Sequence, residues 1–458
     1  MNPDSLIDAG LSPAEAERKA ATFAANDRAL AAPGDVERLR WFVPGRIEVL
    51  GKHTDYAGGR SLLCAVERGF CVTAIPRNDD VMRVVDAGNQ VEAMFRVSDQ
   101  QAGETRWRTY PATVARRVAR NFPVLPALPA RDARDARAAV ATTLRGADIA
   151  FASDLPRAAG VSSSTALIIA IFTVLAEINQ LEEHPAYREN IPTLDALASY
   201  LGCVENGRTF GTLTGDTGVG TRGGAQDHTA ILRSVPGHLM RYAYSPAAME
   251  AVIPLPSGLT FAIGASGVAA EKTGAAKDQY NRAAEAVAAI LDVWRDTTGH
   301  DEPTLFDLLT RLESFADLRR VLAQSHHPRF APDALLARLD HFEYEAIDII
   351  PRASDALARG DLDTFGALVD DSQASAERWL ANQIPETIAL ARIARSHGAV
   401  AASAFGAGFG GSVWALVRSA DAAAFIEAWR RDYLGRFPAH ADLAQFFVTT
   451  PGPARIRL

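Results

Sequence analysis

The sequence is poor in the features that mark secreted, metal-binding and membrane proteins. Its 458 residues include three cysteines, Cys64, Cys71 and Cys203, whose spacing matches no zinc or redox motif. An odd number of cysteines in a chain of this length favours reduced thiols in a cytoplasmic protein. The most apolar long run, ALIIAIFTVLAEI at 166–178, is too short to span a bilayer and predicts a buried helix. Residues 1–26 mix acids and bases and lack the apolar segment of a secretion signal.

The sequence also lacks an excess of basic residues. The formal net charge is −8, which argues against nucleic acid or an anionic membrane surface as a partner. The run ARDARDAR at 130–137 interleaves arginine with aspartate and is typical of a solvated segment. We therefore expect a small-molecule ligand, and nothing in the sequence demands more than a monomer or a weak homodimer.

The distribution of strand and helix patterns indicates an α/β protein with two domains. Strand-like segments dominate the first half, at 40–51, 61–77, 82–97 and 146–156, with helices near 108–121, 165–180 and 193–211. Helical patterns dominate the second half, at 274–296, 303–325, 333–358 and 361–398, with strands at 258–266 and on both sides of a glycine loop at 399–417. Pro44-Gly45 is expected to interrupt the first strand. The predicted units are a helical extension at 1–32, an N-terminal domain at 33–245 and a C-terminal domain at 246–458.

Two stretches match G-x-G-x-x-G, GVGTRG at 218–223 and GAGFGG at 406–411. A dinucleotide fingerprint needs a strand before the glycines, a helix after them and an acid about 20 residues further on. The first stretch has no strand before it and the second leads into the strand-like SVWALV. The sequence therefore does not indicate a nicotinamide-binding domain.

The segment LPRAAGVSSSTA at 155–166 is more informative. Small residues link a predicted strand to the apolar helix, whose first turn offers unpaired N–H groups and the positive end of the helix dipole. Ser162, Ser163 and Ser164 add hydroxyl groups, one of which could bind a metal ion. This pattern favours a phosphate site, and the alternative is a serine that only caps a core helix.

Phosphate chemistry also needs an acid for the metal ion and a base. Glu205 is a candidate ligand for Mg²⁺, which prefers hard oxygen atoms, unless it is an exposed helical glutamate. Asp227, between a glycine loop and an apolar segment, could accept a proton from a substrate hydroxyl or could simply cap a helix. Neighbouring His228 is a second candidate base, although packing or capping is its simpler role.

These segments together resemble a known family. The segment at 43–59, VPGRIEVLGKHTDYAGG, resembles the galactokinase signature P-G-R-x-N-L-I-G-E-H-T-D-Y-x-x-G. The segments at 155–166 and at 403–416, SAFGAGFGGSVWAL, resemble the second and third motifs of the superfamily of galactokinase, homoserine kinase, mevalonate kinase and phosphomevalonate kinase, called GHMP kinases. AAKDQYNRAAEAV at 275–287 resembles the S-x-Y-N-x-R segment of galactokinases. The likeness runs from about residue 33 to the C-terminus.

The resemblance implies a two-domain GHMP kinase fold, with a mixed-sheet N-terminal domain, a helix-rich C-terminal domain and ATP in the cleft between them. It also implies ATP and Mg²⁺ as cofactors and phosphorylation of a sugar at its anomeric hydroxyl. In this resemblance Asp227 matches the catalytic base, and Arg46 matches the arginine at the reacting groups. The residues that match the ATP site are Gly160 to Ser164, Gly408 and Gly410, and those that match the Mg²⁺ site are Ser164 (or Ser163) and Glu205. The residues that match the sugar site are His53, Asp55, Gly224 and Tyr280.

The chain departs from the family pattern at several positions. Ala158 and Ala407 replace glycines, which could weaken ATP binding if the backbone there needs a positive φ, and Thr165 replaces an alanine. The segment from Glu205 to Asp227 is roughly ten residues longer than expected of a galactokinase, with an extra loop at 211–224. Because alanines stand in both glycine loops, a non-catalytic sugar sensor on this scaffold is the alternative to an enzyme. A kinase for a small non-sugar alcohol is disfavoured by the intact HTDY.

Lys52 replaces the glutamate that faces the hydroxymethyl end of the sugar in the signature. An ammonium group cannot accept a hydrogen bond from a hydroxyl, but it can donate strongly to a carboxylate. The hypothesis is therefore a galactose-like substrate that carries a carboxylate, such as the hexuronic acid galacturonate. One alternative is that Lys52 pairs internally, for example with Asp216, and another is that galactose receives its C6 contact from elsewhere.

Overall fold

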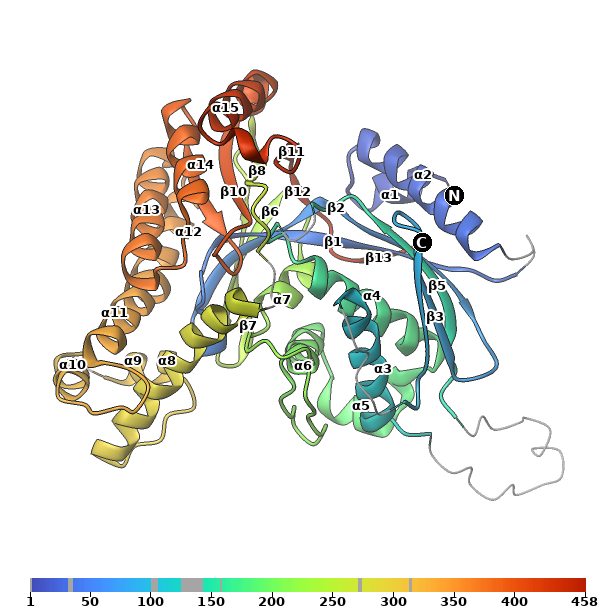
Figure 1. Cartoon of the computed structure of the whole chain (residues 1–458), viewed down its shortest axis with the longest axis horizontal. Helices are drawn as coiled ribbons and strands as arrows, with labels where there is room; N and C mark the ends of the chain where they lie inside the picture. Colours follow the sequence, from blue (N-terminus) through green and yellow to red (C-terminus); the bar gives the residue numbers. More distant parts are fainter. Residues whose placement is uncertain are drawn as a thin grey trace.

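The fold is a mixed nine-stranded sheet followed by a helix-rich region that contains a second, four-stranded sheet (Figure 1). The computed structural model describes residues 2–31, 36–99, 106–124, 143–156, 159–270, 274–312 and 315–458. Ala158 and the 130–137 run lie outside the described residues. Both the mixed sheet and the helical second half agree with the predicted α/β class.

The first sheet has the order β13-β1-β2-β5-β3-β4, with β12 also on β2 and with β6 joining β2 to β7. The β3–β5 pair is parallel and the other pairs are antiparallel. Its strands are β1 (Leu39–Leu50), β2 (Arg60–Pro76), β3 (Val81–Asp86), β4 (Val91–Arg96), β5 (Ala147–Ser153), β6 (His238–Tyr244), β7 (Ala247–Pro254), β12 (Pro451–Gly452) and β13 (Ile456–Arg457). The hairpin β6–β7 lies where the sequence suggested a domain boundary, and it extends the first sheet.

Strand β1 continues through Pro44 and Gly45, so the predicted interruption is wrong. The register against β2 shifts between Pro44 and Arg46, which is how a proline without an N–H group fits into a paired strand. Two residues further on, Glu48 points to the same face as Arg46, because side chains alternate along a strand. Both are buried.

Helices cover both faces of the first sheet (Figure 1). One face carries α1 (Asp4–Asp8) and α2 (Pro13–Leu30), which lie in the predicted helical extension. The other side carries α3 (Thr109–Asn121), α4 (Ser163–Ile178), α5 (Pro185–Asn190), α6 (Leu194–Asn206) and α7 (Gln226–Arg233). As predicted, α4 is a core helix, buried throughout from Thr165 to Leu175. Among the described residues, no helix is both long and apolar enough to cross a membrane.

The second half contains the four-stranded sheet β11-β8-β10-β9 and a stack of helices. Its strands are β8 (Leu259–Ala265), β9 (Ala401–Phe405), β10 (Ser412–Arg418) and β11 (Gln445–Thr449). Its helices are α8 (Gly274–Thr298), α9 (Leu305–Arg311), α10 (Ala316–Ala323), α11 (Pro332–Phe342), the π-helical η5 (Glu343–Ile349), α12 (Ile350–Ala358), α13 (Leu362–Ser375), η6 (Ala376–Leu380), α14 (Pro385–Ser396) and α15 (Ala422–Arg436). The single helix predicted at 303–325 is two helices, α9 and α10.

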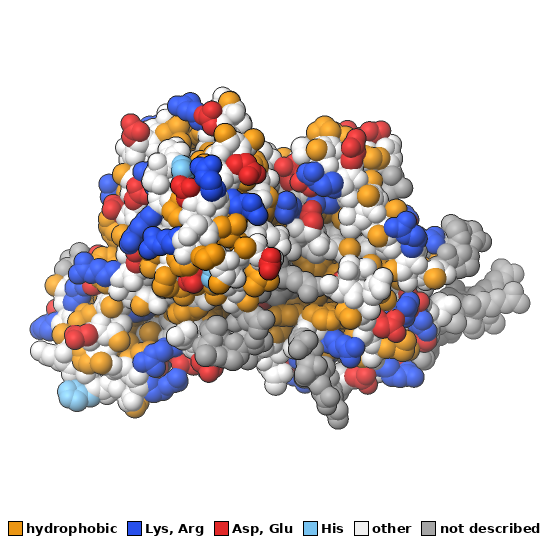
Figure 2. All heavy atoms as spheres, turned by 45° about the horizontal axis from the view of Figure 1, so that its top comes forward, with side chains coloured by type: hydrophobic (Ala, Val, Ile, Leu, Met, Phe, Trp, Pro, Cys, Tyr) orange, Lys and Arg blue, Asp and Glu red, His pale blue; other side chains and the backbone are white. Residues whose placement is uncertain are grey.

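Residues 451–457 leave the second sheet and return to the first one. There β12 pairs with β2 and β13 pairs with β1. The backbone N–H groups of Ala454 and Arg455 donate to the carbonyl oxygens of Ser234 and Ile231, at 3.2 and 2.9 Å, so this segment also holds the end of α7. On the face shown in Figure 2, acidic and basic side chains are interspersed, which fits the absence of a basic excess in the sequence.

Candidate active site

Asp227 lies in the first turn of α7 and is paired with Arg46 of β1. The Nε and Nη2 atoms of Arg46 are both 2.7 Å from Asp227 Oδ1, and Arg46 Nη1 donates to the carbonyl oxygen of Gly160. Ser162 Oγ donates to Asp227 Oδ2. The cap residue of α7 is Ala225, so the capping interpretation of Asp227 is wrong. Burial lowers the pKa of Arg46, but the charges of Asp227 and Glu48 outweigh burial and raise it, which keeps the guanidinium ionised.

The loop before α4 presents the first turn of that helix to the same place. Ser162 is the cap residue, with a left-handed φ of 62°, but its side chain makes no capping hydrogen bond and bonds Asp227 instead. Ser163 and Ser164 begin the helix, where backbone N–H groups lack intrahelical partners and favour an anion. This arrangement fits the phosphate interpretation better than a simple serine cap.

The third motif lies against this loop. Gly408 and Gly410, between β9 and β10, have φ values of +80° and +140°, which L side chains rarely adopt. Ser412 Oγ donates to the carbonyl oxygen of Ala159 at 2.6 Å, so the two glycine-containing loops are joined across 253 residues of sequence. Ala407 lies outside the left-handed region, so the expected conflict at this alanine does not arise, whereas Phe409 adopts φ +58°.

Glu205, in the last turn of α6, is buried rather than exposed. Its Oε2 atom accepts a hydrogen bond from Thr165 Oγ1 at 3.0 Å and lies 3.4 Å from His228 Nε2. Thr165, which replaces the family alanine, therefore orients the carboxylate, and His228 packs against the same group. Ser164 precedes Thr165 in the first turn of α4, and its hydroxyl and the Glu205 carboxylate are of the hard oxygen type that suits Mg²⁺. The described residues contain no group of three or more His, Cys, Asp or Glu side chains that could hold a metal ion.

The residues that the family resemblance assigns to the sugar lie together beside Asp227. Asp55 Oδ2 accepts a hydrogen bond from the backbone N–H of Gln226 at 3.1 Å. A Cβ atom on Gly224 would lie 2.6 Å from Asp55 Oδ2, so glycine permits this close approach. The rings of His53 and Tyr280 are 4.9 Å apart between centroids, and His53 Nε2 lies 3.1 Å from the carbonyl oxygen of Ala407. Burial raises the pKa of Tyr280 well above its usual value, so its hydroxyl stays protonated.

Three family models match the chain: the galactokinase galactose-binding signature at residues 32–76, the GHMP kinase N-terminal domain at 130–205 and the GHMP kinase C-terminal domain at 353–434. A galactokinase from Roseiflexus sp. (strain RS-1) is 28% identical to this chain over 395 residues, which cover 85% of each protein. A galactokinase from Chloroflexus aggregans is 28% identical over 403 residues, which cover 85% of this chain and 86% of that protein. The chain is similar to galactokinases and matches both GHMP kinase domain models. Its fold is similar to that of Lactococcus lactis galactokinase complexed with galactose, with a TM-score of 0.72 at 21% identity over 95% of this chain and 99% of that one.

Lys52 of this galactokinase-like chain is 1% exposed and reaches the second half of the molecule. Its Nζ atom donates to Ser403 Oγ of β9 at 2.9 Å and to Ser372 Oγ of α13 at 3.2 Å. No carboxylate among the described residues forms a salt bridge with it. The suggested pairing with Asp216 is therefore wrong. An ammonium group has three donors, and two of them are used by the serines.

Asp216 belongs instead to the extra loop of the galactokinase-like chain, where it binds two arginines of α3. Its carboxylate is 2.8 Å from Arg116 Nε and 3.4 Å from Arg117 Nη1, and all three side chains are at most 4% exposed. Further along the same loop, the backbone N–H of Arg222 donates to Asn281 Oδ1 of α8 at 2.9 Å. The loop thus connects α3 to the helix that carries Tyr280.

Sequence reasoning missed Glu48. It stands where the signature has asparagine, so a letter-by-letter comparison contained the signal. Glu48 is buried on β1, its Oε2 atom accepts a hydrogen bond from Gln226 Nε2, and burial raises its pKa to about 7. The galactokinase-like site thus contains a second carboxylate next to Arg46 and Asp227.

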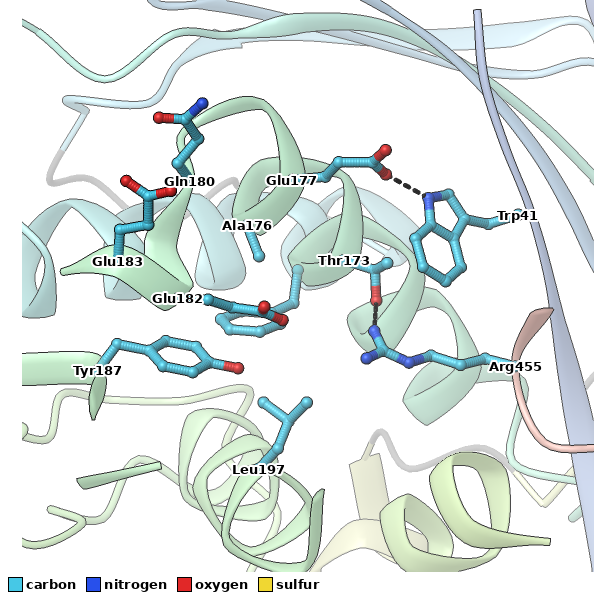
Figure 3. A pocket seen from close by; sticks show the side chains of 11 residues that line it. Trp41, Thr173, Ala176, Glu177, Gln180, Glu182, Glu183, Tyr187, Leu197 and Arg455 are labelled. Carbon is cyan, nitrogen blue, oxygen red and sulfur yellow. Dashed lines mark hydrogen bonds between the residues drawn. The ribbon is translucent and has the colours of Figure 1, made fainter. Parts of the chain in front are cut away.

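A surface pocket of about 290 Å³ lies elsewhere, at the other end of α4 (Figure 3). Trp41 and Arg455 lie on one side of it, bonded to Glu177 and Thr173 of α4. The pocket shares no residue with the site around Asp227. The site around Asp227 is therefore separate from this hollow.

Proposed function

We propose that the protein is an ATP-dependent sugar kinase that phosphorylates the anomeric C1 hydroxyl of a galactose-like monosaccharide. The observation that carries this proposal is the Asp227 carboxylate, held by Arg46 and Ser162 between the first turn of α4 and the sugar-signature residues. A base, a phosphate-binding helix end and a polar sugar site in contact are the parts that phosphoryl transfer to a hydroxyl requires.

In the proposed reaction, an Asp227 oxygen accepts the proton as the O–H bond of the sugar breaks. The sugar oxygen forms a bond to the γ-phosphorus of ATP, whose bond to the β–γ bridging oxygen breaks, and ADP leaves. Arg46 stabilises negative charge on the reacting oxygens, and the N–H groups at the start of α4 hold phosphate oxygens. Mg²⁺, held by Ser164 and Glu205, would neutralise charge on the phosphates. Gly408 and Gly410 let the third-motif loop pack closely against Asn382 and Val268, which holds this loop beside the proposed ATP site.

The proposal is tested by measuring ADP release from Mg·ATP with galactose, galacturonate, glucuronate, arabinose, glucose and N-acetylgalactosamine. We expect turnover of galactose or galacturonate that is much faster than that of glucose, because the signature residues are those of a galactose site. The Asp227→Asn variant supplies the background rate. Absence of sugar-dependent ADP release with every sugar would contradict the enzyme proposal and favour a sugar sensor.

A hexuronic acid is the second candidate substrate, because Lys52 is buried, has two hydroxyl partners and forms no salt bridge with the described residues. Its third donor could bind a C6 carboxylate. If it does, Lys52→Met should lower kcat/KM for galacturonate at least tenfold more than for galactose, since a charge-assisted hydrogen bond is lost. An equal effect on both sugars would leave Lys52 as a link between β9, α13 and the sugar loop.

Replacing Gly224 with alanine is expected to raise KM for the sugar at least tenfold with little change in the Kd of ATP. The added Cβ would lie 2.6 Å from Asp55 Oδ2 and 2.8 Å from the backbone nitrogen of Tyr56, so the sugar loop must move. Steady-state kinetics and ATP titration measure the two effects. Gly435→Ala is the matched control, because a Cβ there has nothing within 4 Å, and it should leave both constants unchanged. An unchanged sugar KM in Gly224→Ala would remove this glycine from the sugar site.

A further inference from the structure

Glu48 is a buried carboxylate with one oxygen satisfied and one not. It is 1% exposed, and its Oε2 atom accepts a hydrogen bond from the side-chain amide of Gln226. Its Oε1 atom is also buried and has no hydrogen-bond partner among the residues that the structure describes. Buried polar atoms are normally hydrogen-bonded, because an unsatisfied one loses its contact with water without compensation. Glu48 is therefore arranged to receive a donor.

The surroundings of Glu48 place that donor at the active site. Gln226, which holds Oε2, directly precedes Asp227, and its backbone N–H binds Asp55. Arg46, two residues before Glu48 on the same strand face, binds Asp227. The carboxylate thus contacts or neighbours the residues that the proposed function assigns to the sugar and to the base.

Two positions of the signature differ in charge in this chain. The signature has asparagine at the position of Glu48 and glutamate at the position of Lys52. In the structure Lys52 is turned toward Ser372 and Ser403, while Glu48 brings a carboxylate to the site from four residues earlier. The chain therefore has a carboxylate at position 48, where the signature has an amide, and an ammonium group at position 52, where the signature has a carboxylate.

We propose that Glu48 is a specificity-determining residue whose free oxygen accepts a hydrogen bond from one hydroxyl of the sugar. This assignment rests on the proposed sugar kinase function. It gives the hydroxyl a charged acceptor that a lysine at position 52 cannot provide.

The ionisation of Glu48 gives this role a recognisable pH dependence. Burial raises the pKa of Glu48 to about 7, Arg46 and Lys52 lower it, and Asp227 and Asp55 raise it. Burial raises the pKa of the Tyr56 hydroxyl, and the charge of Glu48 contributes to this rise, so Tyr56 lies close to the same carboxylate. The ionised form is the stronger acceptor, so sugar kcat/KM should rise as pH increases through about 7, and Glu48→Gln should lack this rise.

The experiment measures kcat/KM for galactose and its 2-, 3-, 4- and 6-deoxy analogues with the wild-type enzyme, Glu48→Gln and Glu48→Asn. Glu48→Asn restores the signature residue and serves as a second variant in case Glu48→Gln does not fold. Thermal unfolding checks that each variant is folded. Glu15→Gln is a control, because Glu15 is another buried glutamate, in α2 and outside the site. We expect Glu48→Gln to lower kcat/KM for galactose about 10- to 100-fold. For the one analogue that lacks the bound hydroxyl, the same substitution should cost less than about threefold.

An equal loss for all five sugars, with an unchanged pH profile, would overturn the assignment and leave Glu48 as support for Gln226. A wild-type protein that phosphorylates none of the five would overturn the proposed function on galactose, and the assignment with it. The two failures are distinguished by wild-type activity alone.

Discussion

Replacing Asp227 with asparagine is expected to lower kcat at least about 1,000-fold and to change the Kd of ATP less than about threefold. The amide cannot accept the proton from the sugar hydroxyl, and general base and electrostatic contributions together reach this size. In the proposed function, ATP binds at the start of α4 and at the glycine loops, which lie on other elements. ADP release measures kcat, and fluorescence or calorimetric titration measures the binding of ATP.

The matched control is Asp355→Asn, which makes the same chemical change in a carboxylate that is 60% exposed and binds Arg241 at 3.4 Å. Its kcat should equal that of the wild type. Loss of ATP binding in Asp227→Asn would contradict the role of a base and indicate that Asp227 organises the phosphate loop through Ser162.

Replacing Asp216 with alanine is expected to lower the free energy of unfolding by about 3–5 kcal/mol, the usual cost of removing one partner from a buried ion pair. Arg116 and Arg117, at 4% and 0% side-chain exposure, would keep their charges in the interior without the carboxylate. Urea unfolding at pH 7 measures the loss. Asp317→Ala is the control, because its side chain is 69% exposed beside Arg320, and it should leave the midpoint unchanged.

The effect of Asp216 should also depend on pH. Burial raises the pKa of this carboxyl, but the backbone N–H of Gly218 and the charges of Arg116 and Arg117 outweigh burial and lower the pKa in the folded state. A lowered folded pKa contributes stability above the unfolded value of about 3.9, and the contribution is lost as pH falls through the folded value. The difference between wild type and Asp216→Ala should therefore be complete at pH 7 and should shrink below about pH 4. A difference that stays constant down to pH 2 would show that Asp216 acts without its charge.

Much of the site could be read from the sequence because its motifs are local. Arg46, Asp227 and the serines of α4 each stand in a short segment with a recognisable chemical pattern, and the structure brings them into contact. The α4 helix was predictable for the same reason, since a continuous apolar run of this length usually forms a buried helix.

What the sequence did not reveal depends on distant segments. The partner of Lys52 comes from residues more than 300 positions away, and that of Asp216 from α3, 100 positions earlier. The hairpin β6–β7 lacks a strong alternating pattern, and only its pairing with β2 makes it part of the first sheet. Glu48 could have been predicted from the signature, because a glutamate stands where the signature has asparagine, but its burial beside Gln226 depends on α7, which lies far away in the sequence.

The return of residues 451–457 to the first sheet affects how the protein can be made. Synthesis proceeds from the N-terminus, so Arg46, Ser162 and Asp227 leave the ribosome long before the strands that close their sheet and the backbone groups that hold the end of α7. Domains of many proteins fold one after another as they emerge. Here the N-terminal sheet cannot be completed until the second half of the chain has been translated, so the first half reaches its final state only after residues 451–457 have joined it.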